Sequence, residues 1–117
     1  MKPLRYVILH HTDIAEPHFD LMFETLPGSD LATWRSHVWP IEQPITVTRL
    51  RDHRRFFLQY EGVLTNQRGM VQRVADGECE VEIGEADRLR IRITSGTTPT
   101  TLRLHKISDN QWRAEPE

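Results

Sequence analysis

The sequence contains one cysteine and no long apolar run, and both facts narrow the class of protein. The single cysteine, Cys79, can form no internal disulfide, which agrees with a reducing compartment and argues against a cysteine-based zinc site. No apolar segment approaches the roughly 20 residues that a membrane-spanning helix needs, and the amino terminus shows no signal-peptide core. We therefore expect a cytoplasmic protein without a membrane partner.

The chain also carries little net charge. Its formal charge of −2 gives no overall attraction to a polyanion, so any nucleic-acid binding must come from a local basic patch. A chain of 117 residues has room for one domain with one modest core, and it shows no internal repeat, low-complexity tract or linker. We expect residues 1–117 to form a single domain, and the protein to be a monomer.

Long helical periodicity is absent as well, and short alternating segments take its place. Apolar and polar residues alternate over residues 78–83 and again over 89–94, with turn residues between them, which predicts a hairpin. One antiparallel register satisfies both faces of this hairpin, since it places glutamates opposite arginines on the polar face. It pairs Glu82 with Arg90, Glu80 with Arg92, Val81 with Ile91 and Cys79 with Ile93.

The whole pattern is typical of an all-β protein with little helix. Further strands are expected over residues 5–9, 18–25, 31–34, 45–48, 56–64, 69–74, 100–106 and 111–114, with turns at 75–77 and 108–110. Many short alternating strands indicate an antiparallel barrel or sandwich. We favour a small closed or partly open antiparallel β-barrel, because closure removes exposed strand edges.

The segment over residues 10–24 contains the most informative cluster of polar side chains. From residue 18 onward the chain alternates with the period of a half-buried strand, so His18 and Asp20 share one face. His10 and His11 end the preceding apolar strand, and only one of them can point toward His18, because adjacent strand residues face opposite sides. Two imidazoles and a carboxylate can hold a divalent metal and leave positions open for water or substrate. We predict a metal site of His11, His18 and Asp20, with His10 as the alternative to His11.

A second cluster of charged side chains surrounds His53. Arg51, Arg54 and Arg55 flank this histidine and could neutralise a nucleic-acid backbone. The competing interpretation is a solvated loop, because exposed arginines commonly serve no partner. We carry all four residues forward as candidate phosphate-binding or nucleic-acid-binding residues.

Together, the two clusters resemble the 3′-phosphoesterase domain of bacterial DNA ligase D, the end-healing module of bacterial non-homologous end joining. The first motif of that family is an apolar strand, a histidine, a short loop and His-aromatic-Asp-x-Arg, which corresponds to residues 6–9, His11 (or His10) and residues 18–22. The second motif is Asp-His, then a tyrosine a few residues later, and then aromatic-Glu-Gly, which corresponds to residues 52–53, Phe57 and residues 60–62. The resemblance covers most of the chain in order and implies a small β-barrel.

The resemblance implies metal-dependent removal of a 3′-terminal phosphate, or of a 3′-terminal ribonucleoside, from a DNA or RNA-tipped primer in DNA repair. It assigns His11, His18 and Asp20 to Mn²⁺ or another divalent metal, and His53 to the scissile phosphate. His53, His18 and Asp20 would then be the catalytic residues. The implied partner is a nucleic-acid 3′ end, with a separate ligase or polymerase left open as a further partner.

Three positions depart from the family pattern, and two of them, Met22 and Phe57, support an alternative function. Met22 stands where the family has an arginine, Phe57 where it has a tyrosine, and Arg51 where it has an acidic residue. Loss of one preorganised donor to a developing oxyanion costs roughly 2.7–4 kcal/mol in transition-state stabilisation. The alternative is therefore a non-catalytic relative that binds a metal or a nucleic-acid end. A cupin-like metal barrel is a third interpretation, because His-x-Asp on a strand loosely resembles the cupin metal motif. It is the most distant of the three, since the usual His-x-His pattern is absent.

Overall fold

The computed structural model describes residues 3–85, 87–96 and 100–117, and most of them lie in β-strands. Within these ranges the only helix is one short 3-10 turn, η1 (Arg55–Leu58). The strands are β1 (Leu4–Thr12), β2 (His18–Glu24), β3 (Leu31–Ser36), β4 (Ile45–His53), β5 (Gly62–Val63), β6 (Met70–Ile83), β7 (Arg88–Ile93), β8 (Thr100–Ser108) and β9 (Gln111–Pro116). In the part of the chain that the structure describes, no helix is long and apolar enough to cross a membrane.

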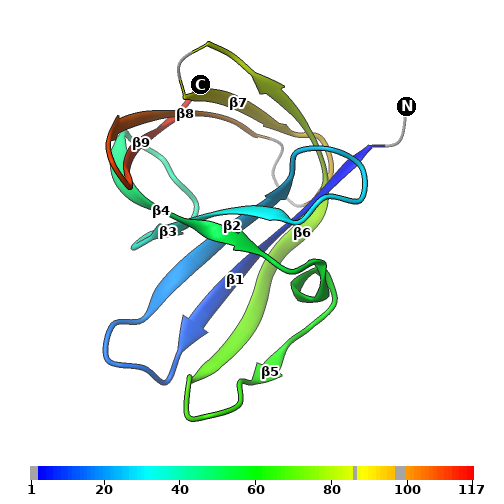
Figure 1. Cartoon of the computed structure of the whole chain (residues 1–117), viewed down its shortest axis with the longest axis vertical. Coiled ribbons are helices and arrows are strands. Elements are labelled where there is room, and N and C mark those ends of the chain that lie inside the picture. Colours follow the sequence, from blue (N-terminus) through cyan, green and yellow to red (C-terminus); the bar gives the residue numbers. More distant parts are fainter. Residues whose placement is uncertain (1–2, 86, 97–99) are drawn as a thin grey trace.

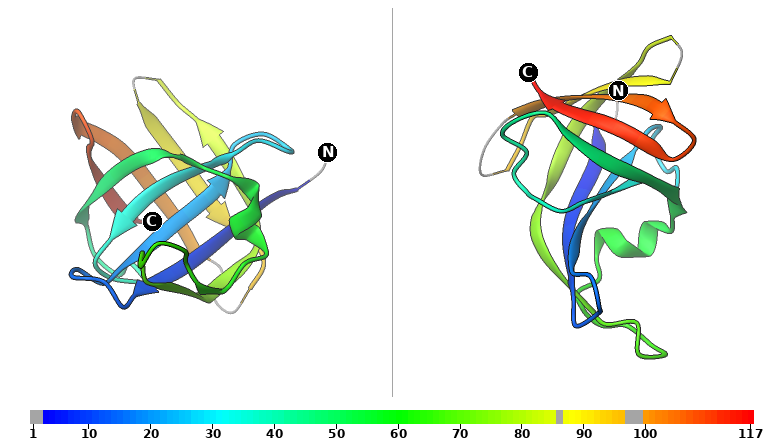
Figure 2. Two further views of the ribbon diagram at one scale, coloured as in Figure 1. Left: turned by 60° about the horizontal axis from the view of Figure 1, so that its bottom comes forward. Right: turned by 90° about the vertical axis from the view of Figure 1, so that its left-hand side faces the viewer.

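Eight of the strands close into an antiparallel barrel, as the sequence predicts (Figures 1 and 2). The strand order is β1-β2-β3-β4-β9-β8-β7-β6, and the pairing of β6 with β1 completes the ring. The remaining strand, β5, pairs with the first residues of β6, where Gly62 lies opposite Val71. Closure pairs β6 with β1, the two strands that would be the edges of the same eight strands in an open sheet, which is the physical advantage expected of this architecture.

Apolar side chains pack on both sides of the barrel wall. Leu21 and Phe23 of β2 point inward and join the main core, where Trp34 packs edge-on against Trp112 with ring centroids 5.4 Å apart. A second, smaller core lies on the outer face of β1, β2 and β3. It consists of Val7, Leu9, Met22, Leu31, Leu58 and Val71. Because η1 contributes Leu58 to it, the segment between β4 and β6 acts as a cover over one outer wall of the barrel (Figure 2).

The predicted hairpin over residues 78–94 is confirmed in its register. Ile83 lies opposite Leu89, and Cys79 lies opposite Ile93. The expected charge pairs form across the two strands, between Arg92 and Glu80 and between Arg90 and Glu82. The turn after Ser108 and the burial of Trp112 in the last hairpin are also as expected.

The prediction of a strand over residues 56–64 is wrong. Its aromatic residues form η1 and the connection that follows, and only Gly62–Val63 pairs as a strand. The apolar run is explained by the second core, because Leu58 is 3 % exposed there while Phe57 and Tyr60 pack beside it. An apolar segment that covers a barrel wall and a strand within a sheet can have the same composition. A few alternating residues therefore do not show which of the two structures forms.

The prediction of a turn at residues 75–77 is also wrong, since β6 runs without interruption from Met70 to Ile83. The register between β1 and β6 shifts by one residue here, leaving Val74 as a bulge between Arg73 and Ala75. Gly77 adopts φ +147°, and a Cβ at this position would lie 2.4 Å from the Ser95 Oγ. The glycine therefore serves a bent strand and a close approach, and not a reversal of the chain.

Candidate metal centre and basic cavity

The predicted metal ligands converge on the outer wall of the barrel. The β1–β2 register places His11 directly opposite His18, and Asp20 follows two residues later on the same face. The Nδ1 atom of His11 lies 3.7 Å from Asp20 Oδ2, and the Nε2 atom of His18 lies 3.2 Å from Asp20 Oδ1. One ligand atom from each residue falls within 4.8 Å of the other two, so the three could hold one metal ion.

His10 lies on the opposite face of β1. Its ring stacks on Phe19 with the centroids 4.4 Å apart, and Phe19 packs against the core inside the barrel. Of the two adjacent histidines, His11 is the one that the structure brings to His18 and Asp20, with ring centroids of His11 and His18 4.9 Å apart. Alternation along β1 accounts for this separation, since Val7, Leu9 and His11 share the outer face.

Both histidines are oriented by main-chain carbonyl groups. The Nε2–H of His11 donates to the Arg68 carbonyl at 2.7 Å, and the Nδ1–H of His18 donates to the Glu16 carbonyl at 2.9 Å. A carbonyl oxygen only accepts, so each neutral ring keeps a lone pair on its other nitrogen, and that nitrogen faces Asp20. Hydrogen bonds of this kind are typical of metal-ligating histidines, because they fix the tautomer and the direction of the ring.

A glycine brings the Arg68 carbonyl within reach of His11. Gly69 adopts φ +87°, which favours glycine, and a Cβ there would lie 2.4 Å from the Thr12 carbonyl oxygen at the end of β1. The cover segment therefore approaches β1 more closely than a larger residue at this position would allow.

The electrostatics of the cluster fit a bound cation. Within the part of the chain that the structure describes, His18 Nε2 and Asp20 Oδ1 are buried and have no aligned hydrogen-bond partner. Both atoms carry lone pairs, so their close approach is unfavourable unless a metal or a proton lies between them. Burial alone would lower the pKa of His18, but the Asp20 carboxylate and the Glu16 carbonyl outweigh it and raise the pKa above its ordinary value.

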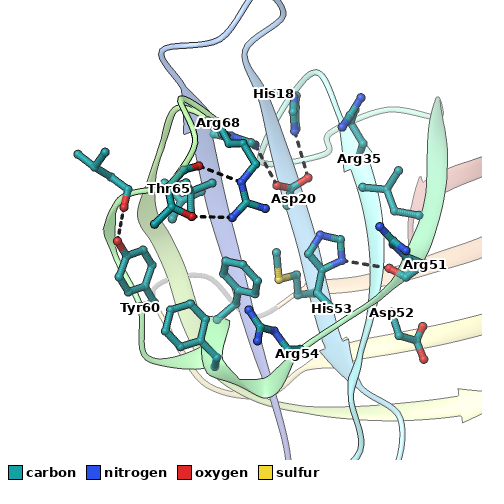
Figure 3. Close-up of a pocket in the computed structure, with 18 residues that line it drawn as sticks. His18, Asp20, Arg35, Arg51, Asp52, His53, Arg54, Tyr60, Thr65 and Arg68 are labelled. Atoms are coloured by element: carbon teal, nitrogen blue, oxygen red, sulfur yellow. Dashed lines mark hydrogen bonds and ion pairs between the residues drawn. The ribbon is translucent and has the colours of Figure 1, made fainter.

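The cluster opens into a cavity of about 730 Å³ between the barrel wall and its cover (Figure 3). Such a volume is in the range of small-molecule sites. Met22, Leu50 and Val71 contribute apolar surface to it, and Asp20 and Asp52 are its acidic residues. The basic side chains around it are Arg35, Arg51, Arg54, Arg68 and His53. A chain with a formal charge of −2 thus has a locally cationic cavity beside a candidate metal site.

His53 ends β4 and points into this cavity (Figure 3). Its Nδ1–H donates to the Arg51 carbonyl at 3.0 Å, and its ring lies edge-on to Phe57 with centroids 5.7 Å apart. The structure thus brings His53 into one cavity with His18 and Asp20, although His53 lies 33 positions after Asp20 along the chain.

The three candidate arginines near His53 separate into two groups. Arg51 and Arg54 line the cavity, whereas Arg55 does not. Arg55 pairs with the buried carboxylate of Glu24 and also donates to the Ser29 carbonyl at 3.0 Å. Its position explains its role: η1 begins at Arg55 and turns this side chain toward the end of β2.

Two further cavity residues, Arg35 and Arg68, were not identified from the sequence. Arg35 lies opposite Asp20 in the β2–β3 register, one residue beyond the strand predicted to end at Trp34. Arg68 donates from its side chain to the Thr65 carbonyl at 3.0 Å and to the Thr65 Oγ1 at 3.1 Å. Strand alternation could have indicated Arg35, because the inward Trp34 implies that the next residue points outward.

An aromatic pair forms one edge of the cavity. Phe56 is half exposed and stacks on Tyr60 at 4.8 Å between ring centroids, with an interplanar angle of 26°. The Arg54 guanidinium lies over the Phe56 ring at 5.8 Å. Flat apolar surface therefore adjoins the cationic cavity.

A scan of the chain against protein-family models gives no match, and a search of curated protein sequences gives none either. The resemblance to the 3′-phosphoesterase domain rests on the motif residues themselves.

Proposed function

We propose that the protein is a divalent-metal-dependent phosphoesterase that acts on nucleic-acid 3′ ends. The observation that carries this proposal is the His11, His18 and Asp20 cluster, in which both free imidazole nitrogens face one buried carboxylate. Two nitrogens and one oxygen suit Mn²⁺ or another divalent first-row metal. A cationic cavity next to such a centre suits a phosphate ester as the substrate.

In this proposal each group has a defined task. When bound, the metal would polarise a phosphoryl oxygen and activate water. His11, His18 and Asp20 would hold it, and the carbonyls of Glu16 and Arg68 keep the two rings in place. His53, anchored through Nδ1, can in its protonated form donate from Nε2 to a phosphoryl oxygen. Arg51 and Arg54 offset charge that develops on the phosphoryl group.

The aromatic edge favours a nucleotide over a simple phosphate ester. Stacking of a base on an aromatic ring is worth roughly 1–3 kcal/mol and tolerates any base. The exposed Phe56 ring beside Arg54 offers such a surface within the cavity, next to side chains that can neutralise a backbone phosphate. A 3′ end restored in this way could be extended by a polymerase or sealed by a ligase, which makes cytoplasmic DNA repair the proposed setting.

A non-catalytic relative is the second candidate, and Met22 and Phe57 favour it. Met22 is 1 % exposed within the second core, so this position offers no donor to a phosphoryl group. Phe57 packs edge-on to His53 and carries no hydroxyl. Such a protein would bind the metal, or a nucleic-acid end, without releasing phosphate.

Metal titration and a phosphate-release assay on the same samples separate these candidates. We would titrate Mn²⁺ by calorimetry into the wild type, His18→Ala and Asp20→Ala, and incubate each with a primer that ends in a 3′-phosphate. His105→Ala is the matched control, because His105 lies on β8 and outside the cavity. Metal binding that both site variants lose, with phosphate release by the wild type, supports the enzyme. Binding without release supports the second candidate, and absence of Mn²⁺ binding by the folded wild type rules out both roles for this cluster.

A further inference from the structure

Arg35 is the cavity cation closest in register to the candidate metal ligands. It lies directly opposite Asp20 on the neighbouring strand, so both side chains emerge from the same outer face of the sheet. The preceding residue, Trp34, is fully buried inside the barrel and fixes this direction. Figure 3 shows the Arg35 side chain beside His18 and Asp20 at the wall of the cavity.

The guanidinium of Arg35 has an unmet hydrogen-bonding need. Its Nε is buried and finds no hydrogen-bond partner in residues 3–85, 87–96 and 100–117. Asp20, its register partner, is directed toward the two histidines instead. Arg55, which does not line the cavity, shows the contrast, since it pairs with a buried carboxylate. A buried N–H of a cationic group without an acceptor is costly, and this cost disappears when an anion enters.

Arg35 also supplies, from another strand, the guanidinium that is missing at Met22, where the family pattern has an arginine. Met22 follows Asp20 by two residues on the same face of β2, where its thioether supplies no charge. Arg35 supplies a cation from β3, on the same face and directly opposite Asp20. A planar guanidinium offers two parallel N–H groups, which match two oxygens of a phosphate monoester.

We propose that Arg35 forms the anion subsite beside the metal centre and binds the oxygens of a terminal phosphate through Nε and one terminal nitrogen. This assignment deepens the proposed function and rests on it for the identity of the natural substrate. The subsite itself is defined by chemistry alone: it accepts a phosphate monoester or inorganic phosphate, and the cation comes from β3 and not from β2.

Inorganic phosphate tests the subsite without any catalytic step. The ¹⁵N-labelled protein is titrated with phosphate, first without metal and then with Mg²⁺, while the arginine Nε–Hε resonances are followed and the affinity is measured by calorimetry. We expect one Nε–Hε resonance, assigned to Arg35 by its absence in Arg35→Gln, to shift saturably. Arg35→Gln should weaken phosphate binding at least tenfold, and Arg35→Lys less, while Mn²⁺ affinity stays within about threefold of the wild type.

Arg113→Gln is the matched control, because it removes the same charge from β9 and outside this cavity. Phosphate affinity in Arg35→Gln equal to that of the control would overturn the subsite, even if the wild type released phosphate from a primer. Conversely, phosphate binding that depends on Arg35 but no release from the primer would keep the subsite and reject the enzyme. Loss of both phosphate and Mn²⁺ binding in the folded Arg35→Lys variant would assign Arg35 to the architecture of the metal site and overturn the proposal.

Discussion

Asp20→Asn should make the metal-free protein more stable and the metal-loaded protein less stable than the wild type. The substitution keeps the shape of the side chain but replaces one carboxylate oxygen with an amide N–H. In the wild type, His18 Nε2 and Asp20 Oδ1 lie 3.2 Å apart, and both are buried without an aligned partner. An asparagine can turn its N–H toward the His18 lone pair and satisfy both positions. Relief of a buried unsatisfied group is worth roughly 1–3 kcal/mol.

Without metal, we expect the gain in free energy of unfolding to lie at the lower end of that range, because Arg35 loses a nearby negative charge in the same variant. With metal the order reverses. At a free metal concentration of about 100 Kd the wild type gains about 2.7 kcal/mol in free energy of unfolding, whereas the variant, with a neutral ligand in place of the carboxylate, gains little. The two proteins should therefore exchange rank when metal is added.

Urea unfolding followed by tryptophan fluorescence measures both states, since Trp34 and Trp112 are buried in the main core. A first series contains chelator at pH 8.5, about two units above the ordinary pKa of histidine, and a second contains MnCl₂ under argon. Asp52→Asn is the matched control, because Asp52 lines the same cavity but is half exposed and pairs with Arg49. Two results would refute the reasoning. One is an Asp20→Asn variant that is less stable than the wild type in chelator, and the other is a variant whose free energy of unfolding rises as much with Mn²⁺ as that of the wild type.

Three further predictions concern the cover and the second core. Burial raises the pKa of Glu24, but the Arg55 guanidinium and the backbone N–H groups of Arg5 and Gly28 outweigh it and lower the pKa. This carboxylate therefore stabilises the fold above pH 4.5 and loses its contribution as the pH falls through the lowered pKa. Glu24→Gln should cost about 1–3 kcal/mol at pH 7 and flatten the acid dependence of urea unfolding. Met22→Arg should destabilise the metal-free protein by about 3 kcal/mol or more, measured in the same assay, because it buries a charge in an apolar cluster. Phe56→Ala should change stability by about 1 kcal/mol or less yet weaken binding of a 3′-phosphate primer by roughly 1–3 kcal/mol, with no effect on inorganic phosphate.

The antiparallel barrel could be predicted from the sequence because its hairpins satisfy polar and apolar faces at once. The register of residues 78–94 follows from glutamates and arginines that alternate with apolar residues, and a shift by one residue would break both sets of contacts. The convergence of His11, His18 and Asp20 follows from alternation along two strands joined by a short loop. Local periodicity was sufficient for these parts because the pairing partners are close in the sequence.

The cover and the second core could not be predicted by the same means. Met22 and Glu24 occupy polar positions of an apparently half-buried strand, yet both are fully buried because η1 packs on their face. That contact joins β2 to a segment about 30 residues later, and no local pattern encodes it. Arg35 was missed for a related reason, since the strand that carries it ends at Ser36, two residues beyond the predicted end.

The candidate site lies outside the barrel, between its wall and a single connecting segment from Arg54 to Gly69. Among the residues that the structure describes, none of those in the main core inside the barrel lines this cavity. An exchange of the connecting segment that keeps Leu58, Arg55 and the Arg68 carbonyl in place would therefore reshape the mouth of the cavity while the closed hydrogen-bond ring stays intact. For an engineer, this divides the molecule into a scaffold and an interchangeable specificity element, joined at two points on β4 and β6.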